Sequence, residues 1–200
     1  MAYSIDSVKD NCYPGTTVLI NKYDIREQSK LDAVESVIVT ARAEEWLAFP
    51  KSASFDFAHY KRIHSFLFGD LYEWAGEIRT TDISKKGTQF CPCSDISHKA
   101  DAAFKYINEN KLYTGLEKSD LVDGIVDFYC VSNYLHPFRE GNGRTQRIFI
   151  SQLIRNAGYD IYFNDIDPDA LMIATIQSAN GITDFLKKIF NDSIIDSHQH

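Results

Sequence analysis

The sequence has few segments with the alternating apolar pattern of strands, and it contains no internal repeat. No apolar run approaches the ~20 residues needed to cross a bilayer, and the first residues do not form a charged and then apolar leader. These absences argue against a β-sandwich, a repeat array and a membrane protein. We therefore expect a cytoplasmic protein with no membrane partner.

Basic residues are also in short supply. The 200-residue chain carries 21 Lys and Arg against 28 Asp and Glu, a formal charge of −7, and no basic face or tail is visible. This balance argues against direct binding to nucleic acid, which depends on neutralising many phosphates. The four cysteines lack the paired CxxC spacings of a structural zinc site, so we expect reduced thiols in packing positions.

What the sequence does contain is helical periodicity. Two hundred residues, of which 44% are hydrophobic, suffice for one good core. Apolar residues recur at helical spacing in seven segments, at 25–49, 56–74, 94–110, 117–135, 144–157, 168–178 and 182–190. Residues 77–83 alternate and are rich in β-branched side chains, and with a return over 88–90 they predict one β-hairpin, the only sheet expected. The predicted fold class is therefore all-α, a helical bundle with one inserted hairpin.

The predicted organisation has three parts. Residues 1–24 contain Tyr13-Pro14-Gly15 and few periodic apolar positions, which indicates an extended N-terminal arm that ends in a turn. Residues 25–192 form the single domain, and residues 193–200 are expected to be a disordered tail.

The densest group of chemically capable side chains lies in the stretch HPFREGNGRTQR, from His136 to Arg147. A predicted helix ends just before it, the turn Gly141-Asn142-Gly143 follows, and a second predicted helix begins there. Helix N-termini expose unpaired amides and a partial positive charge, so a glycine-rich entry suits an anion such as a polyphosphate.

Four side chains around this turn suit phosphate chemistry. Arg144 and Arg147 stand three residues apart on one helical face and are expected to converge on the loop, where guanidinium forks match phosphate oxygens. Glu140 is the hard oxygen ligand suited to a magnesium ion. His136 carries an imidazole, whose ordinary pKa of ~6.5 lets it accept a proton from a hydroxyl. Together they favour transfer of a phosphate-containing group to a hydroxyl.

Each of these features also has an ordinary structural interpretation. A His-Pro pair often caps a helix, Gly-Asn-Gly is often a simple turn, and arginines in a first helical turn are often solvated. Two arginines at the positive end of a helix, however, cost up to ~1 kcal/mol each unless an anion offsets them. The combination therefore favours a ligand site.

The same residues resemble a known family. They match HxFx[D/E]GNGRxxR, the motif of the Fic (filamentation induced by cAMP) family, at every fixed position. Leu71 to Arg79 and the segment Ile83 to Gly87 are similar to the substrate-positioning flap of that family, and Tyr13 to Tyr23 resembles its single-domain bacterial toxins. The resemblance covers about residues 10 to 190 and implies a Fic-type helical bundle.

The resemblance implies a protein adenylyltransferase, which moves AMP from ATP to a Ser, Thr or Tyr hydroxyl of a target protein. It implies that His136 is the base, that Glu140 holds Mg²⁺, and that Arg144 and Arg147 hold the β and γ phosphates. The remaining nucleotide-binding positions are Gly141, Asn142 and Gly143, with Lys85, Lys86 and Gly87 of the flap; the expected target-docking positions are Thr88, Gln89 and Phe90. An extended target segment would pair with the flap by β-augmentation.

Regulation and partners are further expectations from the resemblance. Family members are typically restrained by a helix bearing [ST]xxxE[GN], and the sole [ST]xxxE here, Thr40 to Glu44, is followed by Glu45 and lies in a predicted core helix. We therefore expect a separate small antitoxin that carries an SxxxEG helix. By analogy with the small toxins, the target is expected to be a type II topoisomerase subunit such as DNA gyrase.

Two alternatives to adenylylation remain open from the sequence. The first keeps the fold but transfers a different group, as a kinase-like enzyme does. The second is a non-catalytic helical adaptor whose hairpin binds an extended peptide, against which the intact His136 and Glu140 argue.

Overall fold

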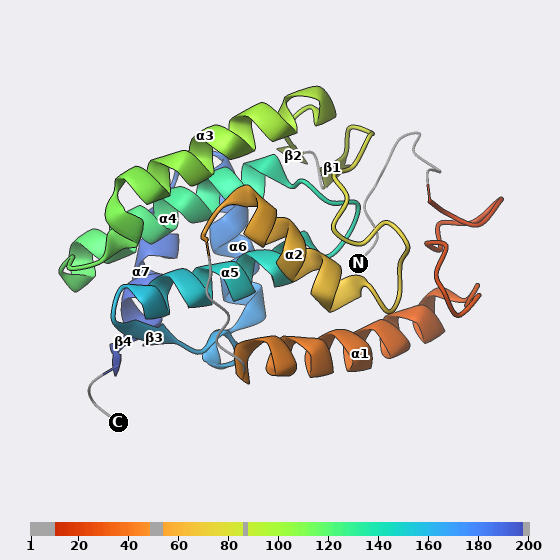
Figure 1. Cartoon of the computed structure of the whole chain (residues 1–200), viewed down its shortest axis with the longest axis horizontal. Coiled ribbons are helices and arrows are strands. Elements are labelled where there is room, and N and C mark those ends of the chain that lie inside the picture. Colours follow the sequence, from red (N-terminus) through yellow and green to blue (C-terminus); the bar gives the residue numbers. More distant parts are fainter. Residues whose placement is uncertain (1–10, 49–53, 86–87, 198–200) are drawn as a thin grey trace.

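The computed structural model describes residues 11–48, 54–85 and 88–197 of the chain, and within them it confirms the all-α class. Helices α2 (Phe57–Phe68) and α5 (Asn142–Asn156) cross the middle of the bundle. In the view of Figure 1, α1 (Gln28–Ala48) runs below them, α3 (Ile96–Glu109) and α4 (Lys118–Leu135) lie above, and α6 (Pro168–Ala179) and α7 (Asp184–Ser193) lie behind. Short 3₁₀ turns occupy η1 (Cys93–Asp95), η2 (Lys111–Tyr113) and η3 (Phe163–Asp165).

The centre of the core is a cluster of aromatic rings around Phe149 of α5. The centroid of this fully buried ring lies within 6 Å of four other ring centroids. They belong to Phe55 before α2, Tyr60 of α2, Phe104 of α3 and Phe128 of α4. Burial of large aromatic side chains dominates the stability of such a core. Because α5 is held from so many directions, its N-terminus has a fixed place in the molecule.

The predicted hairpin exists but is shorter than the sequence pattern indicates. Strand β1 (Ser84–Lys85) pairs with β2 (Thr88–Gln89) in antiparallel register. The alternating segment Glu77–Ile83, predicted as a strand, is instead an irregular loop, because its Arg79 is buried and donates hydrogen bonds to carbonyls of two other segments. Tertiary contacts override the local pattern here.

Two predictions about the C-terminal part are wrong. A second sheet is present, in which β3 (Tyr159–Ile161) pairs with β4 (Ile194–Asp196). The disordered tail was expected from residue 193, yet Ile194 is fully buried in the core. Strands of three residues carry too little alternation to be recognised in a sequence.

The described part of the predicted N-terminal arm, residues 11–24, packs against the start of α1. Tyr13 and Val18 bury Leu31 in a small second core, and Cys12 forms an isolated bridge with Leu19. Asn21 closes this arm: its amide group donates to the carbonyls of Leu19 and Ile25, and its oxygen accepts from the backbone amide of Ile25. The arm is therefore attached to the domain along its described length.

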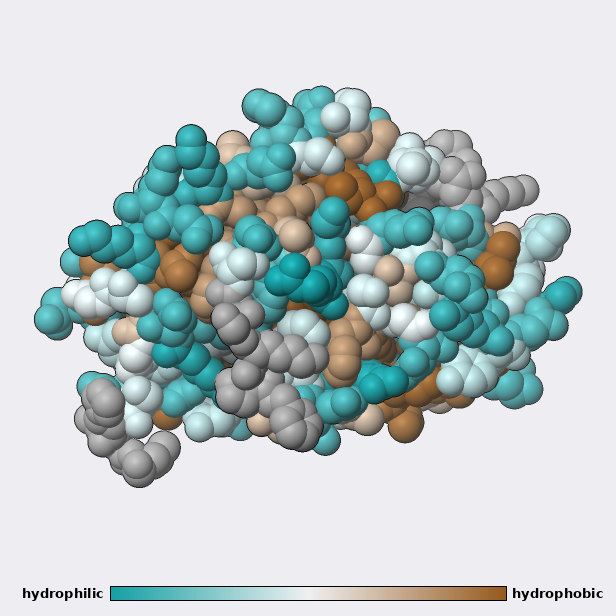
Figure 2. Space-filling view, in the orientation of Figure 1, coloured by the Kyte–Doolittle hydropathy of each residue, from teal (hydrophilic) through white to brown (hydrophobic). Residues whose placement is uncertain are grey.

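The surface agrees with the acidic, polar composition. Figure 2 shows a face that is mostly hydrophilic, with small hydrophobic patches separated from one another. Among the described residues, every helix is too short or too polar to cross a membrane.

Candidate active site

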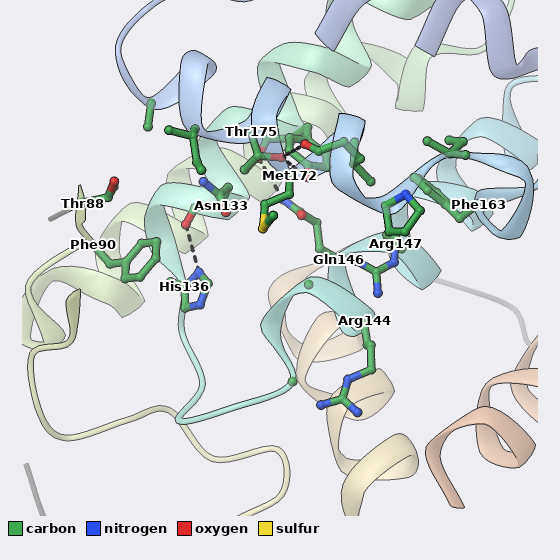
Figure 3. A pocket seen from close by; sticks show the side chains of 18 of the residues that line it. Thr88, Phe90, Asn133, His136, Arg144, Gln146, Arg147, Phe163, Met172 and Thr175 are labelled. Carbon is green, nitrogen blue, oxygen red and sulfur yellow. Dashed lines mark hydrogen bonds between the residues drawn. The ribbon is translucent and has the colours of Figure 1, made fainter. Parts of the chain in front are cut away.

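A pocket of about 580 Å³ opens beside the N-terminus of α5. Its wall is built from four parts of the chain: the last turns of α4, the loop and helix that carry the motif, the returning segment of the hairpin, and the segment from η3 through α6. In Figure 3, His136 and Phe90 lie on one side, the side chains of Arg144 and Arg147 on the other, and Met172 and Thr175 of α6 above them. The volume is in the range of pockets that bind small molecules and cofactors.

Among the residues that the structure describes, no side chain caps the N-terminus of α5. The helix begins at Asn142, two residues earlier than predicted, and Gly141 occupies the cap position without a side-chain hydrogen bond to the free amides. Gly141 has φ +80°, and an added Cβ would approach the ring of Phe68 to 2.3 Å. Glycine is therefore required at 141 by the backbone angle and by core packing, while the uncapped amides stay available to an anion.

Asn142 does not face the pocket. Its buried side chain bridges the loop, since its oxygen accepts from the backbone amide of Phe138 and its NH₂ group donates to the carbonyl of the same residue, both at 2.8 Å. The sequence assigned Asn142 to phosphate binding. The geometry gives its side chain a different task, which is to hold the loop between α4 and α5 in shape.

His136 ends α4 in a left-handed conformation, with φ 39° and ψ 58°. Its ring stacks on Phe90 of the hairpin, with centroids 3.8 Å apart, and its Nδ1 lies 3.3 Å from the carbonyl oxygen of Asn133. A carbonyl only accepts, so this contact places a proton on Nδ1 and makes Nε2 the basic nitrogen of the ring. That tautomer suits a general base.

Arg144 is paired with a residue that the sequence analysis did not single out. Its Nη2 donates to Oε1 of Glu35 in α1 at 2.5 Å, and it lies 3.6 Å from Oε1 of Glu140. Glu35 also accepts a short hydrogen bond from the hydroxyl of Tyr72, whose pKa is raised by burial and by that carboxylate. The guanidinium lies over the ring of Phe68. Arg144 therefore joins α5 to α1 while it lines the pocket.

Arg147 has the opposite surroundings. It lines the pocket, and among the described residues no carboxylate pairs with it and no hydrogen bond satisfies its guanidinium. Burial lowers its pKa, with a further small contribution from the neighbouring charge of Arg144. An unpaired, partly buried cation is costly unless an anion binds to it. The predicted convergence of both arginines on the loop is therefore uneven, because Arg147 is free for a ligand and Arg144 is already engaged.

Among the described residues that line the pocket, Glu140 is the one that carries a carboxylate. Its Oε1 accepts from the backbone amide of Gly141 at 2.8 Å. The described part of the chain contains no cluster of three or more metal-ligating side chains. One carboxylate fits Mg²⁺, which usually binds one or two carboxylates together with substrate phosphates and water. A magnesium ion here would depend on a polyphosphate for most of its coordination.

His64 of α2 supports the loop from the core side. It is fully buried and stacks on Phe138 at 3.8 Å. Its Nδ1 accepts from the amide of Gly76, so its Nε2 carries the proton that is donated to the carbonyl of Glu140 at 2.9 Å. Burial, the largest cause, and the charge of Arg144 together lower its pKa to about 4, although the hydrogen bond to Glu140 acts in the opposite direction. His64 is thus a neutral clamp on the backbone of the Glu140–Gly141 turn.

The structure brings most of the predicted residues into one pocket. Those that line it are His136, Glu140, Gly141, Gly143, Arg144, Arg147, Thr88 and Phe90. Gln89 is exposed and outside it, and Lys86 and Gly87 lie outside the described residues. Lys85 is placed only as part of strand β1, so its predicted role stays a prediction.

The sequence analysis missed the apolar side of the pocket. Phe163, Ile166, Leu171, Met172 and Ile176, from η3 and α6, line it. A signal was available, because α6 is apolar on more faces than one core contact requires, with Ile173 and Ile176 exposed. No comparable signal marked Glu35, which meets Arg144 across 109 positions of sequence.

Comparisons with known proteins agree with this geometry. A profile of the Fic/DOC family matches residues 54–154. The chain is 38% identical to Probable protein adenylyltransferase y4lH of Sinorhizobium fredii over 85% of this chain and 88% of that protein. It is 32% identical to Probable protein adenylyltransferase Fic of Escherichia coli over 92% of each.

The fold is also similar to a solved structure. The BepC protein of Bartonella tribocorum, crystallised with bound AMPPNP, superposes with a TM-score of 0.89 over 93% of this chain and 96% of that one, at 28% identity. The likeness extends well beyond the motif, since it includes most of the bundle.

Proposed function

The chain belongs to the Fic/DOC family, and from that premise we propose that it is a protein adenylyltransferase that transfers AMP from ATP to a Ser, Thr or Tyr hydroxyl of a target protein. One observation carries the proposal: the imidazole of His136 lines the same pocket as Arg147, which has no carboxylate partner among the described residues, and both lie beside the N-terminus of α5. Two further facts support it, namely the adenylyltransferase names of the relatives and the ATP analogue in the BepC structure.

The residues of the pocket divide the reaction between them. Arg147 and the first amides of α5 bind the β and γ phosphates of ATP. The apolar surface of η3 and α6 receives the adenine ring. Glu140 is the residue that would hold Mg²⁺, and the ion would supply positive charge to neutralise phosphate oxygens. Arg144, which is paired with Glu35, contributes positive charge at the edge of the phosphate-binding part of the pocket.

The transfer step uses His136. The target hydroxyl oxygen attacks the α-phosphorus of ATP, its proton moves to Nε2 of His136, and the bond from the α-phosphorus to the bridging oxygen breaks. Pyrophosphate leaves with that electron pair, stabilised by Arg147 and the α5 amides. The target segment lies along the hairpin, where the free edge of a two-stranded sheet accepts an extended chain.

The test is transfer of label from ATP. We expect α-labelled ATP with Mg²⁺ to mark a protein in a bacterial extract with an AMP-sized mass gain, and His136→Ala to reduce the rate by roughly 10²–10⁴-fold. Label transferred from γ-labelled ATP instead would indicate the kinase-like alternative. ATP affinity that is unchanged by Arg147→Ala would favour the non-catalytic adaptor.

We also propose that activity is restrained in trans by a small antitoxin. Glu44, in the sole [ST]xxxE pattern, is exposed and is not a partner of Arg144 or Arg147 among the described contacts. Arg147 is thus open to a glutamate from an SxxxEG helix of a second protein. The test compares AMP transfer by the protein purified alone with AMP transfer after co-expression with the product of the adjacent reading frame. Equal rates in the two preparations would contradict this partner.

The cellular target and compartment complete the proposal. A type II topoisomerase subunit such as gyrase in the cytoplasm is the target to assay first. Incubation of purified gyrase subunits with the enzyme and α-labelled ATP tests it, and subunits that remain unlabelled would exclude them.

A further inference from the structure

Arg79 lies in the loop before the hairpin, and its side chain is 1% exposed. The guanidinium is directed at backbone carbonyls: Nε donates to His136 at 2.8 Å, Nη1 to Thr81 at 2.6 Å and Nη2 to Cys91 at 2.5 Å. A longer bond of 3.4 Å joins Nη2 to the carbonyl of Leu135. A single buried cation therefore bonds four carbonyls from two segments of the chain.

The two segments are the end of α4 and the base of the hairpin. Leu135 and His136 close α4, where carbonyls without helical partners carry partial negative charge and favour a cation. Thr81 and Cys91 stand on either side of the paired strands. Backbone bonds strengthen the junction, because the amide of Arg79 donates to Pro137 and the amide of Cys91 donates to Tyr134, each at 2.9 Å.

The carbonyl of His136 is the informative partner. His136 adopts a left-handed backbone with φ 39°, a conformation that is uncommon for residues other than glycine. Its backbone angles set both the direction of its carbonyl and the starting direction of its side chain, so fixing the carbonyl also fixes the place of the imidazole. A lysine has one ammonium group and cannot bond carbonyls of both segments in this planar arrangement.

We propose that Arg79 is a positioning residue that couples the hairpin to His136. It rests on the proposed function: a target segment docked on the hairpin shifts Thr81 and Cys91, and the guanidinium transmits that shift to the carbonyl of His136. Phe90 reinforces the coupling, since its ring moves with β2 and stacks on the imidazole. The base is thereby aligned by the same element that binds the target.

Arg79→Lys tests the coupling, with Arg155→Lys as the control, because Arg155 lies in the last turn of α5 and pairs with Asp160 at the surface. We expect Arg79→Lys to bind ATP as tightly as the unmodified protein in calorimetry. Label incorporated from α-labelled ATP into a fixed bacterial extract should fall about 10²-fold, the usual cost of a misplaced reacting group. The control should change neither quantity.

Two measurements separate this proposal from the function on which it rests. Amide hydrogen exchange should rise together in peptides covering 80–85, 88–92 and 133–138 of Arg79→Lys, and the ¹⁵N signals of the His136 ring should shift. These readouts need no activity, so they decide the coupling even if the unmodified protein transfers no AMP. Unchanged label incorporation, or an unchanged His136 signal with altered hairpin exchange, would overturn the proposal.

A milder variant keeps the test valid if Arg79→Lys does not fold. Asp82 lies 3.8 Å from Nη1 of Arg79, is exposed, and accepts from the amide of Cys93 at the hairpin base. Asp82→Ala should loosen the hairpin and shift the His136 ring signals without changing ATP affinity. Ring signals that stay in place while hairpin exchange rises would show that the two segments are independent.

Discussion

Arg144 and Arg147 stand one turn apart on α5, and their surroundings differ in almost every respect. Arg144 turns toward α1, where Glu35 neutralises it and Phe68 supports it. Arg147 turns toward the pocket, where burial opposes its charge and no described residue compensates it. The comparison teaches that two identical side chains in one motif can have different surroundings, since one joins two helices and the other lines the pocket without a described carboxylate partner.

The largest expected effect is a loss of unfolding free energy at acidic pH, caused by His64, which lies on the Arg144 side of the site. The folded pKa of His64 is about 4, below the ordinary value of 6.5, so the unfolded chain binds an extra proton between these values. Stability therefore rises with pH from about 4 to 6.5 and falls on acidification, by roughly 3 kcal/mol in total. Urea unfolding at pH 7 and pH 4.5 measures it.

His64→Gln is the control for this acid effect, because glutamine does not titrate. The variant should lose most of the pH dependence in that window. If His64→Gln and the unmodified protein lose the same free energy of unfolding between pH 7 and pH 4.5, another group is responsible.

The second effect concerns the pocket side. Arg147→Ala should weaken ATP binding by roughly 10- to 150-fold, since hydrogen bonds to charged groups contribute about 1.5–3 kcal/mol. The free energy of unfolding should not fall, because the change removes a partly buried charge that no described residue pairs with. Calorimetry with ATP and urea unfolding give both values, and Arg155→Ala on the same helix is the control. Equal ATP affinity in the two variants would contradict the division of labour.

The third effect concerns the partner of Arg144. Glu35→Ala leaves Arg144 and the hydroxyl of Tyr72 without their shared acceptor, and should reduce the free energy of unfolding by about 1–3 kcal/mol. Glu35→Gln should recover part of the loss, because its amide oxygen still accepts. ATP affinity should change far less than in Arg147→Ala. A Glu35→Ala protein that is as stable as the unmodified one would show that the pair is a surface contact.

The smallest effect is expected from Tyr72→Phe. This change removes one hydrogen bond to Glu35 and leaves the buried ring stacked on Trp74, so a loss of about 0.5–1.5 kcal/mol is expected. Thermal unfolding followed by circular dichroism is sensitive enough. A double-mutant cycle with Glu35→Gln then measures the coupling within the trio, and additive losses would mean that the hydroxyl acts independently of the ion pair.

The helices could be predicted because each has apolar residues that recur with a period of 3.6 residues within its own segment. The pocket residues near His136 could be predicted because the motif is contiguous in the sequence. It could not predict contacts made across the fold. Glu35 reads as an ordinary polar residue of an amphipathic helix, and Arg79 sits in an alternating segment that favours a strand.

The motif from His136 to Arg147 shows the limit of reasoning from residue types alone. Asn142 has an amide that suits phosphate binding, and its fixed place in the motif favoured that role, yet the fold directs this side chain into the loop. Gly141 suggested room for a ligand, while the contact with Phe68 shows that packing requires the glycine. The type of a residue determines which interactions its side chain can make, and the neighbours that the fold places around it determine which of them it makes.

The pairing of β3 with β4 has a consequence for synthesis. β3 directly follows α5, and Ile194 of β4 completes the core against which that helix packs. A ribosome that has released residues up to the end of α5 has made the motif and its contacts in α1, α2 and the hairpin, but not the η3–α6 wall of the pocket. The pocket and the core are therefore complete only after β4 has emerged, so the site takes its final form after nearly the whole domain is free to fold.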